Sequence, residues 1–163
     1  MTFGARLRPL RGAAARRAVD SCLMAMRGGS VSPRHVRDVL RCRDVEFPPF
    51  EEFLESNNAM VRMQAAEVVA SCRDEKFVVS AILTEEEVPV TCRMLRELGD
   101  SGCKEVDDLT ILLRHDDSMV VESAFRMFVK VGRADLLFSL AIRSDDVTTE
   151  RVRRYLNEQG WLE

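Results

Sequence analysis

Side chains that commonly carry out catalysis are few and scattered in this chain of 163 residues. It contains no P-loop, no dinucleotide-binding glycine motif, no zinc-protease H-E-x-x-H and no serine-hydrolase G-x-S-x-G sequence. The two histidines, His35 and His115, stand alone and lack the spacing of metal ligands. The pairs Asp116-Asp117 and Asp145-Asp146 each precede an expected helix, where Asp ordinarily serves as a cap. The sequence therefore predicts no enzyme, no metal site and no cofactor.

The cysteines offer little chemistry either, because no two have C-x-x-C spacing and their number is odd: Cys22, Cys42, Cys72, Cys92 and Cys103. This usage is typical of small buried residues in a reducing compartment and predicts a cytoplasmic protein. A lowered thiol pKa is conceivable for Cys42, which lies between Arg41 and Arg43. Residues 1–19 are rich in arginine and lack acids, so a mitochondrial transit peptide is the alternative location.

Basic side chains, most of them arginine, are the chemical groups that recur at helical spacing. Neighbours within each group lie three or four residues apart, which places them on one face of a helix: Arg34, Arg37 and Arg41; Arg93 and Arg96; Arg126 and Lys130; Arg151 and Arg154. The guanidinium fork binds carboxylate or phosphate through two parallel hydrogen bonds, so these residues are candidates for an anion-binding surface. The alternative is a solvated face that neutralises itself, because Asp38, Glu97, Glu122 and Glu150 stand within helical reach.

The elements that position these residues belong to a repeat. When Val61 is taken as position zero, apolar residues fall at 0, +4, +7 and +8, which is one face of a helix. The template recurs from Val90, Val120 and Thr148, at steps of 29, 30 and 28 residues, with Glu97 as an exception. A second apolar series marks the preceding helix of each pair: Phe47, Phe77, Val106 and Leu136, followed by Leu54, Leu83, Leu113 and Ile142. Two helices in a period of about 30 residues predict an all-α superhelix, or solenoid.

The repeat boundaries follow from turn residues. We expect one domain over residues 1–163, with about five helix pairs at roughly 13–43, 44–73, 74–100, 103–132 and 135–160. Ser32 and Pro33 are a favourable helix start in the first, divergent pair. Gly99, Gly132 and Gly160 stand where second helices should end.

The stretch from Asn58 to Val69, with Val61-Arg62 and Ala65-Ala66, resembles the second helix of a HEAT repeat. The short period is similar to the HEAT-like repeats of phycobilisome-lyase-type proteins. The resemblance covers about residues 44–160, although the Val-Arg pair is absent from the other three copies. It implies that second helices line a concave surface, so that the nine basic residues face a shared groove. It also implies, remotely, a lyase-type chaperone of a tetrapyrrole.

Charge is divided along the chain, whose net charge is −3. Residues 1–43 hold ten arginines and two acids, whereas residues 44–163 hold 14 basic and 25 acidic residues. The function that fits best is a non-enzymatic scaffold that binds an acidic protein or peptide segment on its arginine-lined face. Nucleic-acid binding is the alternative, although only 6% of residues are aromatic and the pI is about 5.6. No apolar run approaches the roughly 18–20 residues of a membrane helix, so no membrane partner is expected.

Overall fold

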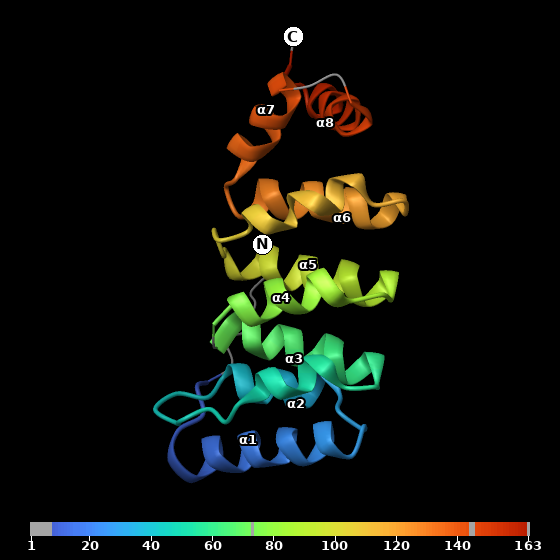
Figure 1. Cartoon of the computed structure of the whole chain (residues 1–163). Coiled ribbons are helices and arrows are strands. Elements are labelled where there is room, and N and C mark those ends of the chain that lie inside the picture. The colour runs from blue at the N-terminus through green and yellow to red at the C-terminus, as the bar shows by residue number, and fades with distance from the viewer. Residues whose placement is uncertain (1–7, 73, 144–145, 163) are drawn as a thin grey trace. The chain divides into compact units, whose positions relative to one another are not determined.

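The computed structural model describes residues 8–72, 74–143 and 146–162. Regular structure in these ranges is helical, apart from one isolated bridge between Leu10 and Cys42, so the predicted all-α class is confirmed (Figure 1). The chain divides into two compact units, Met1–Arg73 and Asp74–Glu163, each described below by itself. The division falls at the boundary between the second and third predicted repeats, and the single domain stays a prediction.

Unit 1 is built from two consecutive helix pairs. Helix α1 packs on α2, α2 packs on α3, and the 3₁₀ helix η1 packs on α3. Their bounds are α1 (Gly12–Arg27), α2 (Pro33–Leu40), η1 (Phe50–Glu55) and α3 (Ala59–Cys72). The core between them contains Cys22, Val36, Phe50 and Val61, all with no exposed surface.

Unit 2 continues the same alternation with three helix pairs. Its helices are α4 (Lys76–Thr84), α5 (Val88–Ser101), the 3₁₀ helix η2 (Asp107–Arg114), α6 (Ser118–Lys130), α7 (Ala134–Arg143) and α8 (Val147–Glu158). Helix α5 packs against α4 and α6, whereas η2 packs against α6 and α8 (Figure 1). Each second helix therefore contacts its own first helix and an element of a neighbouring pair. Within the described ranges no helix is long and apolar enough to cross a membrane.

The second helices match the predicted repeat closely. Helices α3, α5, α6 and α8 begin at Ala59, Val88, Ser118 and Val147. The template positions 0, +4, +7 and +8 are buried in all four, including the exception Glu97. A 3.6-residue apolar period is thus sufficient to identify the buried face of these helices.

The apolar series of the first helices is less reliable, because three of its members are largely exposed. Phe77 is 47% exposed, Leu83 45% and Ile142 81%. In α4 six of the nine residues are apolar, more than one buried face of the helix holds, so the period does not select a single buried face. Packing against α5 and η2 selects it instead and buries Val78, Val79 and Ile82.

The caps predicted from the two Asp pairs before α6 and α8 are confirmed, and Asn58 caps α3 in the same way. The Asn58 Oδ1 atom accepts from the backbone N–H of Met60 at 2.9 Å. Asp117 Oδ1 accepts from the N–H of Met119 at 2.8 Å, and Asp146 Oδ1 accepts from that of Thr149 at 2.9 Å. The other residue of the pair before α8, Asp145, lies outside the described residues.

Among the predicted C-terminal glycines, Gly132 and Gly160 are confirmed, whereas Gly99 is wrong. Gly132 and Gly160 have φ angles of 76° and 70°, in the left-handed region that ends helices. Helix α5 instead continues to Ser101 and ends at Gly102, with φ 76°. Gly99 lies inside α5, where an added Cβ would lie 3.4 Å from the side chain of Lys130 in α6. A side chain at position 99 would therefore contact α6, which packs on α5 at this point.

Candidate anion-binding site

The nine predicted basic residues are divided between the units. Unit 1 contains Arg34 and Arg37 in α2 and Arg41 at its C-cap. Unit 2 contains the other six, which belong to its second helices: Arg93 and Arg96 in α5, Arg126 and Lys130 in α6, and Arg151 and Arg154 in α8. These six residues are called below the second-helix face of unit 2, and that they form one shared surface stays a prediction.

In unit 1, two arginines share one carboxylate. Arg34 Nε lies 4.0 Å from Asp38 Oδ2, and Arg41 Nη1 lies 3.2 Å from Asp38 Oδ1. Arg41 also donates to the carbonyl oxygen of Arg8 at 2.7 Å and 3.1 Å, which fixes its orientation. Arg37 is exposed and makes no ion pair with any residue in the described ranges. The helix therefore keeps a net positive charge.

In α5, two arginines again share one carboxylate, but this carboxylate is buried. Arg93 Nε donates to Glu97 Oε1, and Arg96 Nη2 lies 3.4 Å from the same oxygen. Glu97 is only 8% exposed. Because a buried carboxylate is costly unless it is paired, the two guanidinium groups account for an acid at a core position of the template.

The basic residues of α6 are neutralised by single partners. Arg126 Nε bonds to Glu122 Oε1 at 2.9 Å within the helix. The Lys130 ammonium bonds to the Asp100 carboxylate of α5 and so joins the two helices. For these two cations, the alternative of a self-neutralised face holds.

Two of the three arginines of α8, Arg151 and Arg154, have no carboxylate partner among the described residues. Arg151 Nη1 donates to the carbonyl oxygens of Leu113 at 3.3 Å and His115 at 3.0 Å, at the C-terminal end of η2. Such bonds satisfy the free carbonyls of a helix end but leave the positive charge without a carboxylate. Arg154 is exposed and forms no hydrogen bond or ion pair with the described part of the chain, so the predicted pair with Glu150 is not formed.

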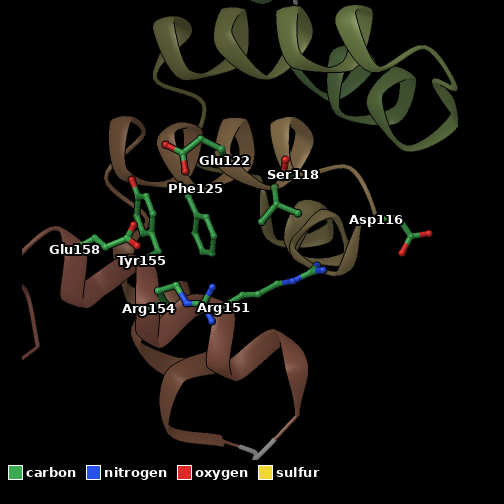
Figure 2. A pocket seen from close by; sticks show the side chains of 9 residues that line it. Asp116, Ser118, Glu122, Phe125, Arg151, Arg154, Tyr155 and Glu158 are labelled. Carbon is green, nitrogen blue, oxygen red and sulfur yellow. The ribbon is translucent and has the colours of Figure 1, made fainter.

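A hollow of about 250 Å³ lies between α6 and α8 beside these arginines. Figure 2 shows the side chains that line it, including Phe125 and Tyr155. Their rings stack with centroids 4.2 Å apart and an interplanar angle of 5°. Tyr155 is a template position, at +7 from Thr148, whereas Phe125 lies at +5 from Val120 and outside the template, and the hollow was not predicted. The only signal was that two aromatic residues fall on second helices of successive pairs.

Acidic groups also line the hollow, so its charge depends on their pairing. Glu122 is bonded to Arg126, and the carboxylate of Asp116 points away from the other labelled side chains (Figure 2). Burial raises the pKa of Tyr155, and the nearby Glu122 raises it further, so the phenol is neutral at physiological pH. The third acid of the lining, Glu158, lies on the opposite side of the hollow from Asp116 (Figure 2).

The structure overturns the lowered pKa considered for Cys42. Burial raises the pKa of its thiol, and Asp38 raises it further, which together outweigh the lowering by Arg41 and Arg43. Burial also raises the pKa of Cys22 to about 11. All five cysteines are free; Cys72 and Cys92 are half-buried, whereas the other three are buried. A raised thiol pKa disfavours the nucleophilic thiolate.

The two histidines have local structural roles. His35 Nδ1 accepts from the backbone N–H of Ser32 at 3.1 Å, at the start of α2. His115 Nδ1 accepts from the N–H of Asp117 at 3.0 Å, in the turn before α6. Over the ranges that the structure describes, no three His, Cys, Asp or Glu side chains gather as metal ligands would.

Comparison of the chain with known protein families, with curated proteins and with solved structures gives no match. The resemblance to HEAT-like repeats therefore rests on the sequence pattern and on the helix pairs that follow it.

Proposed function

We propose that this chain is a non-enzymatic interaction module built from HEAT-like repeats, which holds an acidic segment of a partner protein on the second-helix face of unit 2. The observation that carries the proposal is a shortage of carboxylates. Glu97 pairs with Arg93 and Arg96, Glu122 pairs with Arg126, and Asp100 pairs with Lys130. Arg151 and Arg154 pair with no carboxylate in the described part of the chain. The face thus keeps positive charge, although unit 2 as a whole has 12 basic and 19 acidic residues.

Arginine is the side chain best suited to such a partner. Hydrogen bonds between charged groups contribute about 1.5–3 kcal/mol each when they are shielded from water, and the guanidinium fork makes two to one carboxylate. Arg151 is already oriented by two carbonyl oxygens, so less side-chain entropy is lost when it binds. The free, buried thiols fit a reducing compartment, and we place the module in the cytoplasm.

The test is the affinity of a fluorescein-labelled peptide of ten glutamates, measured by fluorescence anisotropy at low salt. We expect Arg154→Glu to weaken binding about tenfold, because it reverses a charge that has no internal partner. The double variant Arg96→Glu with Arg126→Glu should also weaken binding. Arg17→Glu is the matched control, since Arg17 is an exposed arginine of α1 with no partner among the described residues. Equal affinities for Arg154→Glu and Arg17→Glu would refute the proposed surface.

Nucleic-acid binding is a second candidate, which one observation on unit 1 favours. This unit has 12 basic and 8 acidic residues. Four of its arginines are exposed without a partner in the described ranges: Arg16, Arg17, Arg27 and Arg37. Retention on a heparin column that falls steeply with salt, and that the double variant Arg17→Glu with Arg27→Glu abolishes, would support it. Elution without retention at low salt would exclude nucleic-acid binding by unit 1.

A further inference from the structure

We propose that the hollow between α6 and α8 receives one aromatic side chain of the acidic segment, while Arg154 binds a carboxylate next to that side chain. This inference rests on the proposed function and names the chemistry of its ligand: a peptide in which an aromatic residue is flanked by acids. The hollow is the anchor of the complex, and the remaining cations of the second-helix face contact the flanking acids.

The size and lining of the hollow favour a single large side chain. Its volume of about 250 Å³ is below the ~300–1,000 Å³ of typical small-molecule pockets. Val121 and the stacked pair Phe125 and Tyr155 supply an apolar floor. An aromatic ring that packs on such a pair adds a favourable ring contact to the burial of its surface.

The cations at one edge of the hollow favour an acid next to that ring. Arg151 and Arg154 enter the lining from the same face of α8, three residues apart (Figure 2). Neither has a carboxylate partner within the described residues, whereas the acid on the opposite helix, Glu122, is neutralised by Arg126. A carboxylate of the ligand therefore binds the guanidinium group of Arg154, while Arg151, whose Nη1 is bonded to two backbone carbonyls, adds positive charge beside it.

The experiment compares two labelled peptides that differ in one residue. One has a tryptophan between two runs of four glutamates, and the other has a serine in its place. Both are titrated against the native protein and against Ser118→Trp, which fills the hollow from an exposed position in its lining. Met119→Trp is the matched control, because Met119 is 64% exposed on the same helical turn but does not line the hollow.

We expect the tryptophan peptide to bind the native protein and Met119→Trp about tenfold more tightly than the serine peptide does. Ser118→Trp should abolish this difference, so that both peptides bind this variant with the same affinity. If both peptides bind the native protein equally, the aromatic anchor is wrong and the acidic-segment function stands. If neither peptide binds, the proposed function fails together with the anchor. A preference for tryptophan that persists in Ser118→Trp would place the aromatic residue elsewhere and would also overturn the inference.

Discussion

Units 1 and 2 place arginines on their second helices in the same way but neutralise them differently. In α2 the shared carboxylate, Asp38, has a side chain that is 34% exposed, whereas in α5 the shared carboxylate, Glu97, has one that is 10% exposed. A solvated acid only screens its arginines, but a buried acid depends on them for its stability. Unit 2, although more acidic in composition, also contains two second-helix arginines with no carboxylate partner in the described ranges, Arg151 and Arg154, so a negative net charge does not exclude a cationic site.

The difference in burial predicts unequal costs when either shared carboxylate is removed. Glu97→Gln should lower the free energy of unfolding by about 2 kcal/mol, because two guanidinium groups lose a charged acceptor in a buried site. Asp38→Asn should lower it by less than about 1 kcal/mol, as exposed pairs do. Urea unfolding followed by circular dichroism measures both. Equal decreases in the free energy of unfolding would show that burial does not distinguish the two carboxylates.

Low pH should lower the stability of unit 2, because two of its carboxylates accept hydrogen bonds in the folded state. The hydrogen bond from Arg133 lowers the pKa of Asp107 below its usual 3.8, and the backbone N–H of Thr149 lowers that of Asp146. A carboxyl with a lowered folded pKa stabilises the protein above its unfolded pKa, and this stabilisation is lost as pH falls through the folded pKa. The urea concentration at the midpoint of unfolding should therefore decrease as the pH is lowered from about 5 to about 2.

The only tryptophan of the chain, Trp161, belongs to unit 2 and provides the readout of that change. Its fluorescence should show a smaller fall of the urea midpoint with pH in the double variant Asp107→Asn with Asp146→Asn than in the native protein. An unchanged pH dependence in that variant would assign the acid sensitivity to other groups.

The smallest effect concerns the exposed pair of α6. Glu122→Gln should change the free energy of unfolding by less than about 0.5 kcal/mol, the usual worth of a helical surface pair. It should nevertheless increase the affinity for the glutamate peptide about threefold, because it releases Arg126 and removes an acid from the hollow. Glu105→Gln is the matched control, since Glu105 pairs with Lys76 at 3.4 Å and does not line this hollow. A similar increase in both variants would indicate a long-range charge effect.

The sequence predicted what depends on local chemistry. The buried faces of the second helices follow from their apolar period, and the caps by Asn58, Asp117 and Asp146 follow from residue type at a turn. Glu97 is the exception to the apolar template. Its pairing is indicated in the sequence by Arg93, four residues before it, and by Arg96, one residue before it. These features involve partners within one turn of helix.

Features that depend on packing between elements could not be predicted in the same way. Gly99 has the residue type of a cap, but the proximity of α6 decides its role. The partners of Arg151 lie 36 and 38 residues earlier in the chain, beyond the reach of a helical wheel. The hollow exists only because α6 and α8 meet through two aromatic rings, and no period in the sequence shows that contact.

Nuclear magnetic resonance of the arginine Nε–Hε groups, during titration with the tryptophan-containing glutamate peptide, tests the binding surface most directly. We predict that the signals of Arg154 and Arg151 shift in proportion to bound peptide, while those of Arg17 and Arg27 in unit 1 stay in place. Shifts confined to the unit 1 arginines, or an unmoved Arg154 signal at saturation, would contradict an acidic-segment site on the second-helix face of unit 2.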